Sequence, residues 1–274
     1  MCTYGGDSLE FLKDAIESTL GAEGSGVLLL GIEEPLPEDT RIYLDSLADN
    51  PRLKLKRYPH RYGFAPVLND LIEASIGDPT CEFIFRMDSD DICLKDRFVR
   101  QEAYFKDNPV VDVLGGCAVL IDENGQRYGE VRKVASHARM KRMLPIDSPL
   151  LHPTVAFRAS VLRKGFRYPT NIVCEDLAFW ATLLEAGIVF GNIQEHLLEY
   201  RQTRSTYTRR KGFAQGWPAM TVRLKYIWKV MPFRVDLALL VIGVTFAKAL
   251  VPASLMGKLY GLRAQLIAGP SRRL

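Results

Sequence analysis

Short apolar runs alternate with stretches of helical periodicity over residues 1–90. The run at 27–32 is continuous and follows a turn rich in Gly and Ser, which is typical of a strand buried on both faces of a parallel sheet. Residues 53–57 alternate instead, which predicts a strand nearer an edge, and residues 83–87 form a further apolar strand. Helical periods over 9–20, 37–47 and 66–76 connect them. This order predicts an α/β fold with a mainly parallel sheet.

Local signals refine this prediction. Asp7 and Glu10 have the spacing of a capping box at the start of the helix 9–20. Residues 119–121 predict a strand that enters an Asn-Gly turn, and residues 175–186 predict a helix with Leu177, Trp180 and Leu184 facing inward. The later part of the chain is therefore mixed α and β.

An acidic cluster, Asp88-Ser89-Asp90-Asp91, directly follows the predicted strand 83–87. In open α/β sheets this end of the strands is where ligands bind. Carboxylates one residue apart on a turn can face one small volume, and their oxygens suit Mg²⁺ or Mn²⁺. We therefore predict that Asp88 and Asp90 hold a divalent metal that bridges two phosphates. The alternative is a solvated acidic turn that caps a helix beginning near Leu94.

The context of the cluster resembles a known family. The segment 86–91, followed by Asp96-Arg97-Phe98, resembles the signature of family 2 glycosyltransferases that build bacterial capsules, O-antigens and exopolysaccharides of the amylovoran type. Matching segments follow in order along the chain to about residue 204: 4–20, Gly63 with Leu68-Asn69, 108–116, 152–158 and 175–180. The resemblance implies a GT-A, Rossmann-like fold, a nucleotide-sugar donor and inversion at the anomeric carbon.

The resemblance also implies roles for individual residues. An inverting transfer needs a base for the acceptor hydroxyl, which the family places at the position of Asp176, with Glu175 orienting the acceptor or tuning its neighbour. Ordinary capping would also favour acids at this helix start. The positions assigned to the nucleotide sugar are Tyr4, Glu33, Asn69, Arg86, Asp88, Arg201 and Arg204.

Some of these positions have two interpretations. The guanidinium groups of Arg201 and Arg204 suit diphosphate oxygens, although exposed arginines near a basic tail are common. His152 and Arg158 either contact the donor or pack structurally. The chain also departs from the family pattern: residues 1–4 are shorter than the usual first strand, Gly5 replaces an Asn, and Arg61 stands where Asn is common. Glu33 is one methylene longer than the usual Asp.

Length and charge suggest two parts. A chain of 274 residues with 47% hydrophobic content can bury a full core. Residues 1–200 hold 22 Lys/Arg and 31 Asp/Glu, whereas the remainder holds 14 Lys/Arg and one acid, Asp236. We predict a GT-A domain over 1–204 and a basic helical tail over 205–274. Such a charge excess usually indicates an anionic partner.

The tail combines basic, aromatic and apolar residues. Its apolar stretch 235–247 is interrupted by Lys248 and falls short of the roughly 20 residues of a bilayer span. Trp and Tyr interleaved with Lys and Arg favour an anionic membrane surface over nucleic acid. A packing appendage with a solvated basic face is the alternative. With no signal sequence and five scattered cysteines, we expect a cytoplasmic protein with reduced thiols, peripheral to the inner face of the cell membrane.

The predicted function is therefore transfer of a sugar, from a UDP-sugar, to a glycan or lipid-linked glycan in cell-surface polysaccharide synthesis. Two alternatives stay open. One is a noncatalytic glycan-assembly scaffold with the same fold, against which the intact Asp88, Asp90 and Asp176 count. The other is a sugar-nucleotide nucleotidyltransferase, which lacks support because no Gly-rich loop bearing Arg and Lys occurs near the N-terminus.

Overall fold

The computed structural model describes residues 1–24, 26–203 and 213–250. The strands are β1 (Cys2–Tyr4), β2 (Leu28–Glu33), β3 (Leu53–Tyr58), β4 (Phe83–Phe85), β5 (Ile92–Cys93), β6 (Val113–Ile121), β7 (Arg127–Val131), β8 (Ala156–Arg158) and β9 (Phe190–Arg201). The helices are α1 (Leu9–Gly21), α2 (Glu38–Ser46), α3 (Phe64–Ile76), α4 (Arg97–Asp107), α5 (His137–Met143), the 3-10 turn η1 (His152–Thr154), α6 (Ala159–Arg163), α7 (Glu175–Glu185), α9 (Phe213–Val230) and α10 (Val235–Leu250).

The strands form two sheets. The first has the order β1-β2-β3 with parallel neighbours, as the βαβ order of the sequence predicts, and β3 lies at its edge. The second has the order β4-β8-β6-β9-β5, with β7 paired to β6. Only β6 and β9 are parallel there, and its other pairs are antiparallel. The expectation of a mainly parallel sheet thus holds for the first sheet, whereas the second is mixed. There β7 returns antiparallel to β6 directly after the turn at 122–126, and the pairs β4–β8, β6–β8 and β5–β9 are antiparallel as well.

The start of α1 differs from the predicted capping box. Ser8 occupies the N-cap position and makes no side-chain capping bond. The Asp7 carboxylate instead accepts hydrogen bonds from Thr3 Oγ1 at 3.0 Å and from Ser89 Oγ at 2.9 Å. A tertiary contact with the acidic loop has replaced the local cap, so Asp7 joins the first turn of the chain to that loop.

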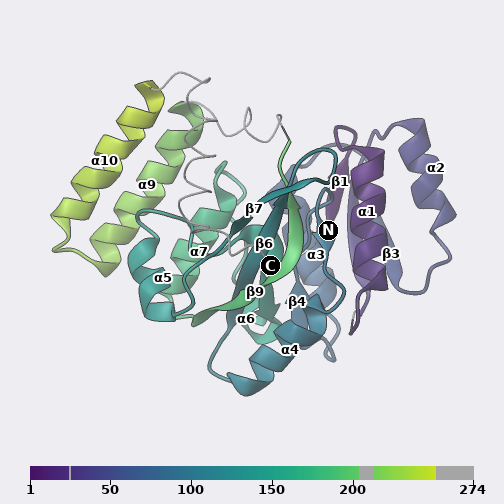
Figure 1. Cartoon of the computed structure of the whole chain (residues 1–274), viewed down its shortest axis with the longest axis horizontal. Coiled ribbons are helices and arrows are strands. Elements are labelled where there is room, and N and C mark those ends of the chain that lie inside the picture. Colours follow the sequence, from purple (N-terminus) through teal and green to yellow (C-terminus); the bar gives the residue numbers. More distant parts are fainter. Residues whose placement is uncertain (25, 204–212, 251–274) are drawn as a thin grey trace.

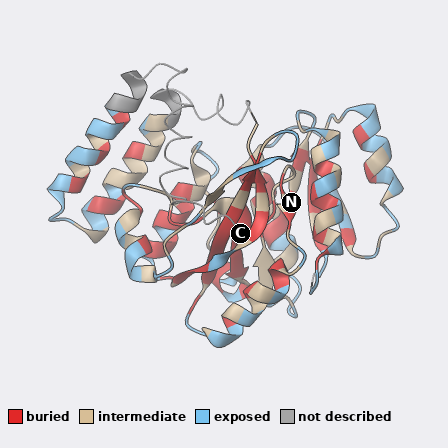
Figure 2. Ribbon diagram, viewed as in Figure 1, coloured by how far each residue is buried: buried red, intermediate tan, exposed pale blue. Residues whose placement is uncertain are grey.

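An aromatic core lies between the second sheet and α7. Trp180, Phe179, Phe157 and Phe190 are almost fully buried there, and the rings of Phe157 and Trp180 stack with centroids 6.0 Å apart. Figure 2 shows buried residues concentrated in the central strands and on the inner faces of the helices that cover them. Burying large rings stabilises such a core strongly, and it fixes the start of α7 relative to the sheet.

The helices α9 and α10 lie side by side at the end of the molecule opposite α1 and α2 (Figure 1). Tyr226 of α9 is fully buried in the aromatic core, and its hydroxyl donates to the Lys141 carbonyl at 3.1 Å. Lys229 forms an ion pair of 2.8 Å with Glu185 of α7. Within the described ranges, no helix has the length and apolar content needed to cross a membrane.

Candidate active site

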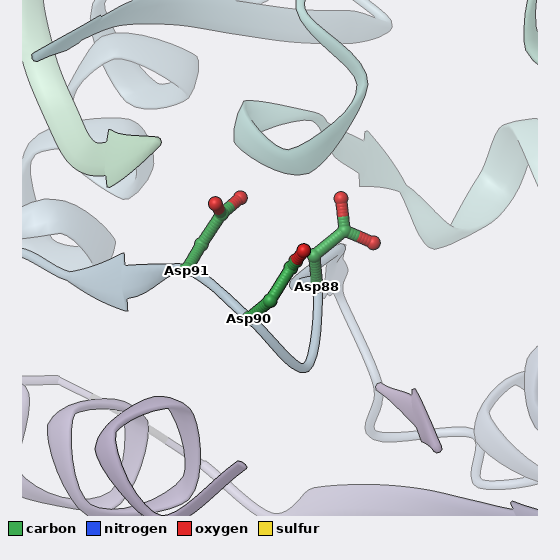
Figure 3. A group of neighbouring side chains, drawn as sticks. All are labelled: Asp88, Asp90 and Asp91. Atoms are coloured by element: carbon green, nitrogen blue, oxygen red, sulfur yellow. The ribbon is translucent and has the colours of Figure 1, made fainter. Parts of the chain in front are cut away.

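The acidic loop 88–91 joins β4 to β5. One carboxylate oxygen from each of Asp88, Asp90 and Asp91 lies within 4.8 Å of the others. Figure 3 shows the three side chains projecting to the same side of the loop. The sequence places these acids directly after a strand, and the structure shows that the loop gathers all three at one point.

Asp91 is the most constrained member of this cluster. Its side chain is fully buried, and Oδ1 accepts a hydrogen bond of 2.8 Å from the Arg201 amide. Its Oδ2 atom is buried with no hydrogen-bond partner among the described residues. Burial raises the pKa of Asp91 well above its ordinary range, and the charges of Asp88 and Asp90 raise it further. A divalent cation fits this donor set, because it would offset the repulsion between the three carboxylates.

Arg86 places a buried positive charge beside the cluster. Its guanidinium forms an ion pair with Asp88 and lies over the Phe64 ring, 5.2 Å from the ring centroid. Burial alone would lower the pKa of this guanidinium, but the Asp88 carboxylate outweighs burial and raises it. Nε and Nη1 are buried with no hydrogen-bond partner in the described part of the chain. These donors are of the kind that suits phosphate oxygens.

Two other arginines hold the acidic loop in place. The fully buried Arg97 donates from Nη2 to the carbonyls of Arg86 at 2.6 Å and Pro153 at 2.9 Å. Arg201 donates from Nε to the Asp90 carbonyl at 2.9 Å and from Nη2 to Asp14 at 2.9 Å. The guanidinium of Arg201, predicted to suit diphosphate, is thus engaged in fixing the loop to α1 and β9. Arg204 lies outside the described residues.

The start of α7 carries Glu175 and Asp176. Asp176 Oδ1 accepts a hydrogen bond of 2.7 Å from the Leu177 amide. Burial raises the pKa of Glu175 to about 7, and the charges of Asp176 and Asp88 raise it as well. Because Asp88 and Arg86 both act on Glu175, the start of α7 belongs to the same electrostatic environment as the acidic loop.

His152 and Arg158 pack structurally, which was one of the two interpretations for each. His152 Nε2 lies 2.9 Å from the Tyr168 hydroxyl, and burial lowers the pKa of the imidazole well below its ordinary value. Arg158 donates from Nε to the Val111 carbonyl and from Nη2 to the Phe105 carbonyl, both at 2.7 Å. Arg158 thus ties the end of β8 to α4 and to the segment before β6, and His152 packs against Tyr168.

Three further positions predicted to bind nucleotide lie around the first sheet. Tyr4 and Glu33 are register partners at the ends of β1 and β2. The Tyr4 ring lies 4.1 Å from the Arg61 guanidinium, and Glu33 Oε1 accepts a hydrogen bond of 2.6 Å from the Gly63 amide. Asn69 exchanges two hydrogen bonds with the Tyr168 backbone, at 2.8 and 2.9 Å, so its amide ties α3 to the segment that leads to α7.

Several contacts that shape this site could not be predicted from the sequence. The contacts of Arg97 with residue 153 and of Asp7 with residue 89 join segments that are distant in the chain. The role of Tyr168 as the partner of His152 and Asn69 likewise depends on tertiary packing. Asp91 lies in the acidic cluster, Arg97 in the segment 96–98 of the family signature and Asp7 at a predicted helix start, but none of these patterns indicated the contacts that the residues make.

The raised pKa of Glu175 predicts a pH-dependent stability. The folded state holds the Glu175 proton more tightly than the unfolded chain, whose pKa is near the ordinary 4.5. This contribution to stability is fully present below that pH and is lost as the pH rises through about 7. We expect Glu175→Gln to raise the free energy of unfolding near pH 8 by about 1–3 kcal/mol, allowing for partial exposure, and to change it little near pH 4.

Urea unfolding at both pH values measures this effect. Glu17→Gln is the matched control, because Glu17 is exposed on α1 and should change stability little at either pH. An equal effect of Glu175→Gln at both pH values would contradict the assignment of the raised pKa.

Sequence comparisons give consistent relatives. The model of "Glycosyl transferase family 2" matches residues 1–166, which is more than half of the chain. An uncharacterized glycosyltransferase of Haemophilus influenzae is 25% identical over 271 residues, covering 95% of this chain and 96% of the relative. The amylovoran biosynthesis glycosyltransferase AmsE of Erwinia amylovora is 26% identical over 214 residues, 77% of each chain.

A third relative has a named reaction. The Escherichia coli UDP-Gal:alpha-D-GlcNAc-diphosphoundecaprenol beta-1,3-galactosyltransferase is 25% identical over 213 residues, 77% of this chain and 76% of the relative. The similarity to each of these three proteins extends well beyond the acidic loop.

Solved structures share the fold. Residues 1–349 of TarS from S. aureus, in complex with UDP, align with a TM-score of 0.62 at 14% identity, over 86% of this chain and 66% of that one. The mannosyltransferase PcManGT of Pyrobaculum calidifontis, in complex with GDP-Man and Mn²⁺, aligns with a TM-score of 0.60 at 13% identity, over 96% of this chain and 78% of that one. The matched family and the shared architecture agree with the site geometry: this chain belongs to glycosyl transferase family 2 and is a glycosyltransferase with the GT-A fold.

Proposed function

We propose that this enzyme transfers a sugar from a UDP-sugar, with inversion at the anomeric carbon, to a glycan or lipid-linked glycan during cell-surface polysaccharide synthesis. The observation that carries the proposal is the shared environment of two acidic groups. Three carboxylates converge on the loop 88–91, and the start of α7, with Glu175 and Asp176, lies within their electrostatic reach. An inverting transfer needs these two functions, donor binding and proton removal, at one site.

The donor end would use the acidic loop. Asp88 and Asp90, with Asp91 behind them, would hold Mg²⁺ or Mn²⁺, which neutralises charge on a diphosphate leaving group when bound. Arg86 keeps Asp88 in place and has buried donors of its own. Tyr4 and Glu33 are the candidates to receive the base and ribose. A UDP complex and a GDP-Man and Mn²⁺ complex among the structural neighbours support this arrangement.

The acceptor end would use α7. As the acceptor oxygen forms its bond to the sugar C1 and the bond from C1 to the donor phosphate breaks, Asp176 takes the hydroxyl proton. The Leu177 amide, 2.7 Å from Asp176 Oδ1, holds the carboxylate in position. Glu175, with a pKa near 7, orients the acceptor and tunes its neighbour.

The acceptor itself is inferred from a relative. The Escherichia coli relative is named for transfer to a GlcNAc-diphosphoundecaprenol, which is lipid-linked. An acceptor of this class would be reached by a protein peripheral to the inner face of the cell membrane.

Product analysis tests this proposal. The purified full-length chain would be incubated with Mn²⁺, a lipid-linked glycan acceptor and a panel of UDP- and GDP-sugars. We expect acceptor-dependent release of UDP from a UDP-sugar. A noncatalytic scaffold would release no nucleotide from any donor, and a nucleotidyltransferase would instead form pyrophosphate from a nucleoside triphosphate and a sugar phosphate. Either result would contradict the proposal.

A further inference from the structure

The helical hairpin, defined as α9, α10 and the turn 231–234, exposes a concentrated apolar surface. Sixteen large apolar side chains are exposed in the described part of the chain, and eight of them lie in this hairpin. They are Trp217, Trp228, Phe233, Val235, Leu239, Leu240, Val244 and Phe246. The other eight are distributed over residues 27–173. Single exposed apolar residues are ordinary, but a group of this size on one surface indicates an interaction site.

The inner contacts of the hairpin do not account for this surface. Leu237 and Val241 of α10 are buried against Met220 and Ile227 of α9. Phe233, in the turn, is 94% exposed, and Trp228 is 78% exposed. Figure 2 shows exposed and half-buried residues over much of α10, with few buried ones. These inner faces hold α10 to α9, and the exposed residues of the hairpin lie outside that interface.

The charge of this region indicates the kind of partner. Its one acid beyond residue 200, Asp236, is neutralised by an ion pair of 2.7 Å with Arg234. Lys225 is exposed one turn before Trp228, and Lys229, which is exposed and also pairs with Glu185, follows Trp228 directly. A cationic excess interleaved with Trp, Phe and Leu matches an anionic lipid surface, where aromatic rings lie at headgroup depth and basic groups contact phosphate. An apolar surface that bound another protein would not require this excess of positive charge.

We propose that the outer surface of the helical hairpin docks on an anionic membrane, with Trp228 and Phe233 entering the lipid headgroup region. One part of the inference rests on the proposed function: docking on a membrane would bring a lipid-linked acceptor to Asp176. α9 packs along α7, whose first turn carries Asp176, so docking through the hairpin would hold the helix of the proposed base close to the membrane surface. Docking itself does not depend on catalysis.

Vesicle flotation of the full-length chain tests docking. We expect binding to vesicles of phosphatidylglycerol and phosphatidylethanolamine, weaker binding to phosphatidylcholine vesicles, and partial release when the salt concentration is raised from about 0.1 M to about 1 M. The double variant Trp228→Ser/Phe233→Ser should lower vesicle affinity by at least about tenfold, because it removes two exposed rings. The matched control is Ile42→Ser/Val110→Ser, which removes side chains exposed by 60% and 72% on the catalytic domain and should float like the wild type.

Other outcomes would overturn the proposal. These are failure of the wild type to float with anionic vesicles, equal flotation with neutral vesicles, or equal loss in the control variant. A dimer in sedimentation that dissociates in the Trp228→Ser/Phe233→Ser variant, without vesicle binding by the wild type, would assign the surface to a second copy of the chain. Asp90→Asn should float normally. If the wild type floats with anionic vesicles but turns over no nucleotide sugar, the proposed function is refuted and the docking proposal is not.

Discussion

Asp90→Asn is expected to lower donor turnover by about 10²–10³-fold while leaving the fold intact. The substitution keeps the size of the side chain but replaces one of three converging carboxyl groups by a neutral amide, which weakens metal binding at the loop 88–91. Repulsion among these carboxylates also falls, so stability without metal should not decrease. Steady-state rates over a range of Mn²⁺ concentrations, together with thermal unfolding of the same samples, measure both effects.

Asp107→Asn is the matched control for this experiment, since Asp107 is exposed at the end of α4. A chelator should reproduce the defect in the wild type. Equal turnover by the wild type and Asp90→Asn, with and without chelator, would show that the acidic loop does not hold a catalytic metal.

Asp176→Asn is expected to lower sugar transfer by about 10²–10⁴-fold and to leave metal-dependent UDP binding unchanged. The amide cannot accept the acceptor proton, whereas the residues around the donor are untouched. Its oxygen can still accept from the Leu177 amide, so the start of α7 should be preserved. Calorimetric UDP binding and single-turnover transfer separate the two functions.

Retention of full transfer by Asp176→Asn would exclude Asp176 as the base. Glu175 would then be the next candidate, and its pKa of about 7 predicts how the rate of transfer should depend on pH. Transfer by Asp176→Asn would fall as the pH drops below about 7, and Asp176→Asn/Glu175→Gln would lose this dependence.

Local patterns were sufficient to predict much of the fold. The continuous run at 27–32 and the alternation at 53–57 distinguish the inner strand β2 from the edge strand β3, because each burial pattern repeats within a few residues. The second sheet could not be predicted in this way. β4 pairs with β8, whose residues lie more than 70 positions away, and no local period specifies that partner.

For the candidate site too, some residues could be predicted from the sequence and others depend on contacts between distant segments. Asp88 and Asp90 were named from their position after a strand, and Asp176 from the resemblance to the family. The buried state of Asp91 was not foreseen, because it requires the amide of Arg201. The interpretation of Asp7 as a helix cap was wrong because Ser89 and Thr3, brought close by folding, compete for its carboxylate.

The bond from the Arg201 amide to Asp91 also has a consequence for the newly made protein, because the two residues are 110 positions apart. At translation rates of about 5–20 residues per second, roughly 5–20 s separate the synthesis of the acidic loop from that of the end of β9. Until then the loop lacks the contacts with which Arg201 fixes Asp90 and Asp91. A ribosome-bound chain that ends before residue 201 should therefore be unable to hydrolyse or transfer the cell's activated sugars, and the enzyme becomes competent only when its catalytic domain is nearly complete.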